Sequence, residues 1–163
     1  MLSIITSVSI NGDLPLNQNG LNERSFSLRA KGTGLVFDVK YPILGFENVI
    51  RFDFKVIDDN FATIQNADGE SPAFTLINPF TLREFTFELP AAIRVLMGIN
   101  ESTNYLVYSI LVVKKPFSDS TANFLAPLIF NIDNKTMSQV VLDEIKYPQY
   151  SAVEPLSNYM TND

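Results

Sequence analysis

Stretches in which apolar and polar residues alternate recur along most of the chain. The clearest covers residues 49–57, where Arg51, Asp53 and Lys55 alternate with apolar residues. A period of two places successive side chains on opposite faces of a β-strand, so the pattern predicts half-buried strands in antiparallel order. The expected strands cover residues 35–40, 49–57, 61–65, 74–77, 82–88, 105–113, 124–132 and 139–142. A hairpin turn at residues 133–135 is expected to join the last two.

One segment, residues 90–98, has a helical pattern instead. Pro90 stands at a first helical position, Ile93, Leu96 and Met97 follow at helical spacing, and a glycine ends the segment. We therefore predict an all-β fold, mostly antiparallel: a small closed or partly open β-barrel with one short helix closing an end. Side chains of the many large apolar residues are expected to fill the interior, leaving no cavity for a small ligand.

Three aromatic-rich segments, residues 41–47, 74–80 and 123–131, are each interrupted by proline. Proline removes a backbone donor and fixes φ, and glycine permits conformations that larger residues resist, so each segment is expected to bend at a fixed corner. The residues expected to shape these corners are Pro42, Gly45, Asn78, Pro79, Asn123 and Pro127. Asn78 and Asn123 are expected to satisfy buried backbone groups.

The first corner carries the apolar residues Ile43, Leu44 and Phe46, followed by Glu47. Apolar side chains exposed at a corner would bind a partner protein. The alternative is that Leu44 and Phe46 plug the end of the barrel. Both interpretations stay open from the sequence alone.

The C-terminal region combines acidic and aromatic residues, a mixture that suits binding to a protein. Its candidate partner-binding residues are Asp143, Glu144, Tyr147, Tyr150 and Glu154. The alternative is a frayed tail, with Tyr147 and Tyr150 packed back on the barrel. We place the barrel domain at residues 35–150 and a tail at 151–163.

Residues 1–34 differ in character from the rest, with four of the seven glycines and a polar stretch at 17–22. Residues 1–10 are apolar enough for a strand, but the polar residues after them offer no obvious partner strand. We expect a weakly ordered N-terminal extension or a misassigned start.

The chain contains no cysteine and no histidine. This composition excludes disulfides, thiolate nucleophiles and the usual zinc clusters, and it removes the commonest general base. The remaining candidates for catalysis are the carboxylates of Asp58, Asp59, Asp68 and Glu70, whose neighbours are typical of solvated turns. We expect no cofactor and no enzymatic activity. The alternatives are a glycosidase with two carboxylates about 5 to 10 Å apart and a sugar-binding module, which the absence of tryptophan disfavours.

The net charge of −6 and the isoelectric point near 4.6 disfavour nucleic-acid binding, which depends on Lys and Arg at phosphates. An acidic surface suits a basic protein partner. The apolar runs are much shorter than the roughly 20 residues that cross a bilayer, and no basic residue precedes Arg24 as in a secretory signal. We expect a cytoplasmic monomer.

The chain carries these short motifs: Pro-Ile-Leu-Gly-Phe-Glu at 42–47, Leu-Ile-Asn-Pro-Phe at 76–80, Phe-Glu-Leu-Pro at 87–90, Leu-Val-Tyr at 106–108, Asn-Phe-Leu-Ala-Pro-Leu-Ile-Phe-Asn at 123–131 and Gln-Val-Val-Leu at 139–142. Together they resemble the FliW family of flagellar assembly factors. Their order and approximate spacing match the family over roughly residues 35–150. Residues 1–34 have no counterpart in that pattern.

The resemblance implies a β-barrel regulator that binds flagellin in the cytoplasm and also binds CsrA, a basic RNA-binding translational repressor. Such a protein would act as a partner switch: free flagellin would occupy it and leave CsrA active, and export of flagellin would release it to relieve the repression. The alternative within the family is a flagellin-specific chaperone that does not bind CsrA.

Overall fold

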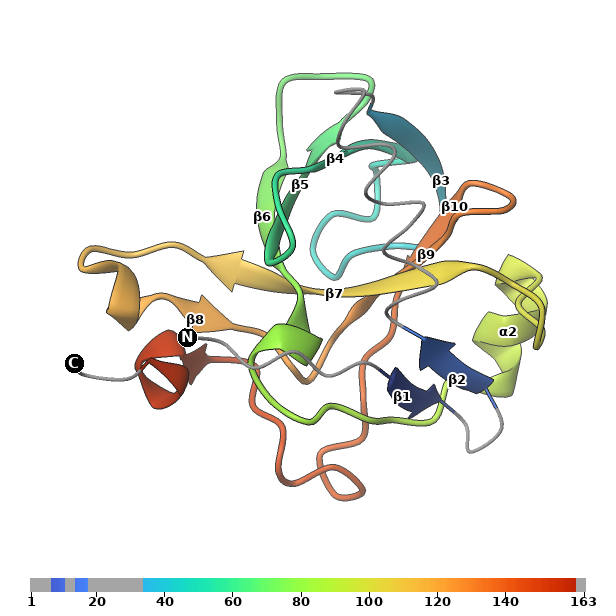
Figure 1. The fold of residues 1–163 in the computed structure, drawn as a ribbon. Helices are drawn as coiled ribbons and strands as arrows, with labels where there is room; N and C mark the ends of the chain where they lie inside the picture. The colour runs from blue at the N-terminus through green and yellow to red at the C-terminus, as the bar shows by residue number, and fades with distance from the viewer. Residues whose placement is uncertain (1–6, 11–13, 18–33, 161–163) are drawn as a thin grey trace.

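The computed structural model describes residues 7–10, 14–17 and 34–160 (Figure 1). Strands β1 (Ser7–Ile10) and β2 (Leu14–Asn17) form a separate two-stranded antiparallel sheet, in which Ser7 lies opposite Asn17. The partner strand that was not obvious from the sequence is therefore β2. Residues 1–6, 11–13 and 18–33 of the expected N-terminal extension lie outside the described ranges.

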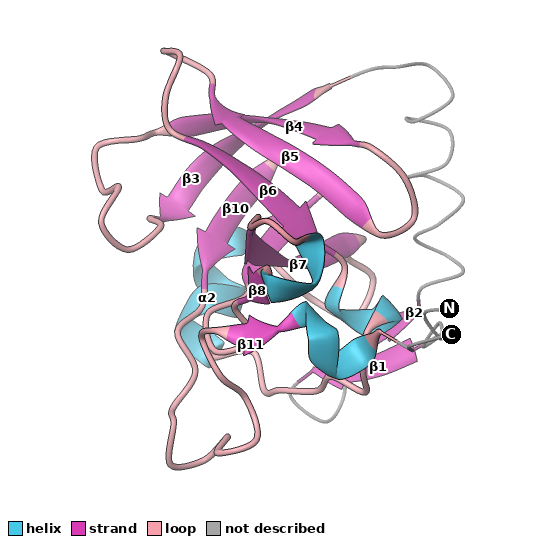
Figure 2. Cartoon of the chain, turned by 90° about the vertical axis from the view of Figure 1, so that its left-hand side faces the viewer, coloured by secondary structure: helices cyan, strands magenta, loops and turns pink. Residues whose placement is uncertain are grey.

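The main sheet contains nine strands (Figures 1 and 2). They are β3 (Leu35–Tyr41), β4 (Arg51–Val56), β5 (Phe61–Asn66), β6 (Ala73–Ile77), β7 (Tyr105–Val112), β8 (Thr121–Ala122), β9 (Leu128–Asn131), β10 (Thr136–Gln139) and β11 (Glu154–Pro155). Pairing between β7 and β9 closes seven of them into a barrel, in the order β7-β6-β5-β4-β3-β10-β9. Strands β8 and β11 extend the sheet from β7. The predicted fold class is confirmed.

The barrel has one parallel pair among its described strands, β3 with β10. A ring whose strands alternate in direction throughout needs an even number of strands, and this ring has seven. The hairpin of β9 and β10 therefore brings β10 to β3 running in the same direction. One parallel seam among antiparallel pairs agrees with the predicted, mostly antiparallel fold.

The prediction of a strand at residues 82–88 is wrong. This segment follows a short 3-10 helix (Pro79–Thr81) and is irregular apart from one bridge residue at Phe87. Its backbone donors go to side chains: the amides of Thr86 and Glu88 donate to the hydroxyls of Tyr150 and Tyr147. Alternate aromatic residues are still buried there, which explains why the sequence resembles a strand.

Two other strands are shorter than expected or displaced. The strand expected at 124–132 is confined to β9, because the bend that contains Asn123 and Pro127 comes before it. The strand expected at 139–142 lies earlier, as β10, since the turn at 133–135 leads directly into it.

Aromatic side chains fill the middle of the barrel. The ring centroid of Phe130 lies 5.1 Å from that of Phe37 and 4.9 Å from that of Phe54, and Tyr108 lies 5.6 Å from Phe54. All of these side chains are at most 5% exposed. The strands are therefore held together by packed rings, whose tilted and edge-to-face geometry is favourable.

The predicted helix is α2 (Ala91–Met97), which buries Ile93 and Met97. It starts after Pro90 and ends at Gly98, whose φ of 67° is left-handed and favours glycine. Asn131 and Asn134 both donate side-chain hydrogen bonds to the Met97 carbonyl, at 2.8 and 2.7 Å. The end of the helix is thus attached to the β9–β10 hairpin. No described helix has the length and apolar character needed to span a membrane.

The C-terminal segment belongs to the folded domain as far as residue 160. Strand β11 pairs with β8, and the following 3-10 helix (Leu156–Tyr159) buries Leu156. The Arg83 guanidinium lies 5.5 Å from the Phe124 ring centroid and 5.0 Å from that of Tyr150, close enough for cation–π attraction. The separate tail expected from residue 151 is corrected accordingly, because strand pairing and apolar burial hold this segment against the barrel.

An ion pair between Arg51 on β4 and Asp68 in the β5–β6 turn predicts a small pH-dependent contribution to stability. The hydrogen bond from Arg51 lowers the pKa of the Asp68 carboxyl below its ordinary value of 3.8. A carboxyl with a lowered folded-state pKa stabilises the fold above the unfolded-state pKa, and this contribution is lost as the pH falls through the folded-state value. Both side chains are largely exposed, so the effect is small.

Urea unfolding of the wild type and Asp68→Asn between pH 7 and pH 2 checks this prediction. The wild type should be slightly more stable at pH 7, and the difference should close below about pH 4, where the carboxyl protonates. A difference that stays constant over this range would contradict the assignment.

Candidate functional site

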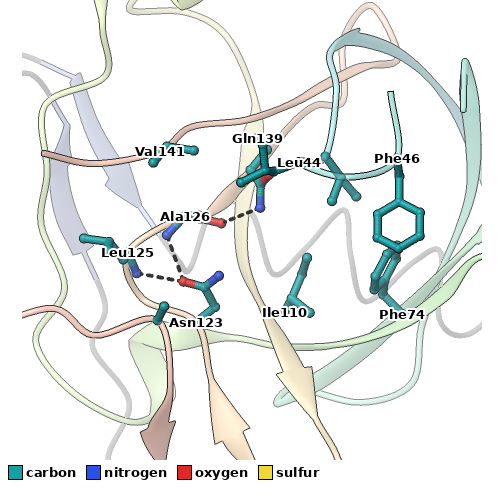
Figure 3. A pocket seen from close by; sticks show the side chains of 11 residues that line it. Leu44, Phe46, Phe74, Ile110, Asn123, Leu125, Ala126, Gln139 and Val141 are labelled. Atoms are coloured by element: carbon teal, nitrogen blue, oxygen red, sulfur yellow. Dashed lines mark hydrogen bonds between the residues drawn. The ribbon is translucent and has the colours of Figure 1, made fainter. Parts of the chain in front are cut away.

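A groove about 320 Å³ in volume lies on the surface beside the first proline-containing corner (Figure 3). It is lined by Ile43, Leu44, Phe46, Phe74, Ile110, Asn123, Leu125, Ala126, Gln139, Val141 and Ala152. We call it the corner groove. The lining is mainly apolar, and its rim is open to solvent because Leu44 is 76% exposed and Val141 57% exposed. The interior of the barrel is packed, but this surface groove is a feature that the sequence did not predict.

The corner itself is a β-turn that presents Leu44 at its tip. The Phe46 amide donates to the Ile43 carbonyl at 2.8 Å, and Gly45 has a φ of 90°, as the third residue of a type II turn requires. Ile43 is only 3% exposed and belongs to the core, so the expectation of partial exposure is wrong for it. Phe46 is half-buried and packs edge-to-face on Phe74, with ring centroids 5.1 Å apart. Of these three apolar residues, only Leu44 projects fully into solvent.

Gln139 connects the corner to the bend at residues 123–127. Its Oε1 accepts a hydrogen bond from the Leu44 amide at 2.8 Å, and its Nε2 donates to the Ala126 carbonyl at 3.3 Å. The side chain is 4% exposed. Sequence reasoning missed this residue, because a single glutamine beside apolar residues carries no signal of a bridge between distant segments.

Asn123 shapes the other side of the groove. Its Oδ1 accepts hydrogen bonds from the amides of Leu125 and Ala126, at 3.1 and 3.0 Å. Its Nδ2 is directed away from that bend, toward the middle of the groove (Figure 3), and donates to no acceptor among the described residues. The groove therefore contains one free hydrogen-bond donor in mainly apolar surroundings.

The remaining corner residues support the backbone. Asn78 Oδ1 accepts from the Phe80 amide at 3.1 Å, at the start of the 3-10 helix that Pro79 begins, and its Nδ2 donates to the Asp59 carbonyl at 3.4 Å. Pro127 is buried, and its carbonyl accepts from the Val140 amide at 2.9 Å. Pro42 is half-buried in front of the turn.

Acidic residues occur in two of the segments that contribute lining residues to the groove. Residues 42–48 and 139–145 contain Glu47, Asp143 and Glu144 and no lysine or arginine. Each of these three acidic residues is exposed. Glu47 also accepts a hydrogen bond from the Gly45 amide at 3.0 Å, and this bond lowers the pKa of its carboxyl.

The C-terminal candidates are divided between structure and surface. Tyr150 is 7% exposed, and its hydroxyl both accepts from the Thr86 amide and donates to the Thr86 carbonyl, at 2.9 and 2.8 Å. Tyr147 is half-buried, and its hydroxyl accepts a hydrogen bond from the Glu88 amide at 2.8 Å. Glu154 Oε1 accepts from Asn158 at 2.7 Å. Both tyrosines thus pack back on the barrel, whereas Asp143 and Glu144 stay exposed.

The candidate catalytic carboxylates lie in turns. Asp58 Oδ1 accepts from the amides of Asn60 and Phe61, both at 2.8 Å, and Asp68 pairs with Arg51. Glu70 is exposed in the same turn as Asp68. Within the described ranges, no cluster of three or more acidic residues is placed to hold a metal ion.

Comparison with known proteins identifies one family. A family model described as FliW protein matches residues 24–156, a wider range than the expected 35–150. The flagellar assembly factor FliW 2 of Wolinella succinogenes is 50% identical over 127 residues, which are 78% of this chain and 93% of that protein. The flagellar assembly factor FliW of Sulfurimonas denitrificans is 44% identical over 124 residues, which are 76% of this chain and 97% of that protein.

A solved structure agrees with these sequence matches. The crystal structure of a flagellar assembly factor FliW aligns with a TM-score of 0.68 at 25% identity, covering 74% of this chain and 84% of that chain. The barrel, the motifs at its corners and the matched sequence range all lead to the same conclusion: this chain belongs to the FliW family of flagellar assembly factors.

Proposed function

We propose that this protein binds flagellin in the cytoplasm and also binds and antagonises the translational repressor CsrA, relieving repression of flagellin synthesis. The observation that carries the proposal is the corner groove, whose apolar lining and exposed Leu44 are typical of a protein-binding surface. Membership of a family of flagellar assembly factors supports flagellin as a partner. The protein acts by binding alone, without catalysis or cofactor, and works as a monomer.

The acidic character of the chain supports the second partner. CsrA binds RNA, so it needs positive charge to neutralise phosphates. A net charge of −6 on this protein favours association with such a partner. A flagellin-specific chaperone without CsrA binding is the alternative.

Calorimetric titration of the purified protein with flagellin and with CsrA from the same organism, separately and then in competition, tests the proposal. Binding to both, with flagellin displacing or blocking CsrA, is the expected result. Binding to flagellin alone would favour the chaperone, and binding to neither would refute the proposed function. Light scattering during gel filtration measures the mass in solution and so checks whether the protein is a monomer.

A further inference from the structure

We propose that Arg83 is a positioning residue for partner binding, because it couples the C-terminal segment, residues 147–160, to the shape of the corner groove. Arg83 does not line the groove, so it acts through the bend at residues 123–127. This inference rests on the proposed function, for which the groove is the binding surface.

The bend at residues 123–127 has one side in the groove and one side in the core. Asn123 and Leu125 line the groove (Figure 3), whereas Phe124 between them does not and is 0% exposed. The Phe124 ring packs edge-to-face on that of Tyr159, with centroids 6.1 Å apart. The position of Phe124 among its buried neighbours therefore sets the position of the two residues that form this wall of the groove.

Arg83 holds the inner side of the bend and the C-terminal segment together. Its guanidinium lies 5.5 Å from the Phe124 ring centroid and 5.0 Å from that of Tyr150, both within the range of cation–π attraction. Its Nη1 also donates to the Gln149 carbonyl at 3.3 Å and to the Tyr159 hydroxyl at 3.4 Å. One half-buried side chain thus joins the bend to the C-terminal segment.

The backbone of the C-terminal segment also reaches the bend and the groove. The Phe124 amide donates to the Ser151 carbonyl at 3.0 Å, and the next residue, Ala152, lines the groove. Strand β11 pairs with β8 over two residues of each strand. A segment held by such short pairing opens at a lower free energy than the strands of a closed barrel. Release of the segment from Arg83 should therefore loosen the bend while the barrel stays folded.

Binding in the groove and attachment of the C-terminal segment are then coupled in both directions. A partner that needs the bend in its ordered position stabilises the attached segment, and the attached segment strengthens binding by the same factor. Without the Arg83 contacts, only a fraction of the molecules holds the bend in the binding-competent position, and the affinity falls by that fraction.

Hydrogen exchange of the free protein tests the structural part of the inference. Arg83→Met keeps a long apolar side chain and removes the guanidinium. The amides of Leu125 and Ala126, which both donate to Asn123 Oδ1 inside the bend, should then exchange about tenfold faster. Arg83→Lys keeps the positive charge without the planar fork, so it should show a smaller increase.

Two controls separate coupling from general destabilisation. Amides of β5 are the internal reference and should keep their protection in Arg83→Met. Arg51→Met removes another arginine, which pairs with Asp68 in the β5–β6 turn, and should leave the amides of Leu125 and Ala126 unchanged. If only the Phe124 amide exchanges faster in Arg83→Met, the arginine fixes the C-terminal segment without controlling the bend, and the inference is overturned.

Calorimetric titration with flagellin and with CsrA, in separate experiments, tests the functional part. Leu44→Ser identifies the partner that contacts the groove, because Leu44 is exposed on its rim. Arg83→Met should weaken the binding of that same partner by about two- to thirtyfold, as residues that couple distant sites do. The double variant should lose less affinity than the product of the two single effects, since both changes act on one surface.

The outcomes distinguish this inference from the proposed function. If Leu44→Ser weakens binding and Arg83→Met does not, Arg83 does not position the groove, while the proposed function stands. If Leu44→Ser changes the affinity for neither partner, the groove is not the binding surface and the inference is overturned, although binding of the wild type to both proteins would still support the proposed function. If the wild type binds neither protein, the proposed function and the role of Arg83 in partner binding are both refuted.

Discussion

Replacing Phe130 with alanine should lower the free energy of unfolding by about 3–5 kcal/mol, the usual cost of removing a fully buried aromatic ring. Phe130 on β9 is 0% exposed, and its ring contacts those of Phe37, Phe54 and Tyr108, from three other strands of the barrel. The deletion leaves a cavity where β9 closes the barrel against β7. A loss of this size is a large part of the roughly 5–15 kcal/mol that stabilises an ordinary domain.

Urea unfolding followed by circular dichroism measures the effect. Phe117→Ala is the matched control, because Phe117 is 42% exposed and its ring contacts only that of Phe61 among the described aromatic pairs, at 6.1 Å. Phe117→Ala should lower the free energy of unfolding much less than Phe130→Ala does. Similar losses for the two variants would show that the cluster around Phe130 does not dominate the core. An unchanged slope with denaturant would show that the wild type and variant unfold from equally compact states.

Replacing Gln139 with methionine should lower the free energy of unfolding by about 1–3 kcal/mol, because it removes a buried side-chain amide at similar volume and leaves its two backbone partners unsatisfied. The Leu44 amide and the Ala126 carbonyl lose their hydrogen bonds to it. The same change releases the corner turn from the 123–127 bend, so the groove should lose its shape.

Urea unfolding measures the loss of stability of the whole domain, and hydrogen exchange at the Leu44 amide measures the local opening of the turn. This amide should exchange faster in Gln139→Met, while amides in β5 and β6 keep their relative protection. Gln65→Met is the control, since Gln65 is exposed and its side chain makes one 3.3 Å hydrogen bond to the Glu70 carbonyl. Unchanged Leu44 exchange in Gln139→Met would mean that the glutamine does not hold the turn.

The local pattern of the sequence was sufficient for most of the elements. Alternation predicts β4 and β5, and the spacing of apolar residues between Pro90 and Gly98 predicts α2. Both signals depend on residues within a few positions of one another, which is the range over which side-chain direction follows from backbone geometry. The same reasoning failed at 82–88, because its alternation is real but its backbone donors are taken by two tyrosines about 60 residues away.

The candidate site was predicted less completely than the fold. The sequence leaves open whether Leu44 is exposed at its corner or plugs the barrel end, and it predicts Glu47, Asp143 and Glu144 as acidic candidates. Tyr150 was a candidate too, but its burial gives it a structural role. Gln139 was not singled out at all, because its importance depends on hydrogen bonds to Leu44 and Ala126 that form only in the folded chain.

The sequence by itself determined most of the strand-forming segments, the bends at proline and glycine, the acidic character and the resemblance to the FliW family. Each of these depends on residue type and short spacing. Only the tertiary structure decided that seven strands close the barrel with one parallel seam, and that the corner at Leu44 faces the bend at Asn123 to form a groove. Those features depend on contacts between residues far apart in the chain, and burial and hydrogen bonding select them only when the whole domain folds.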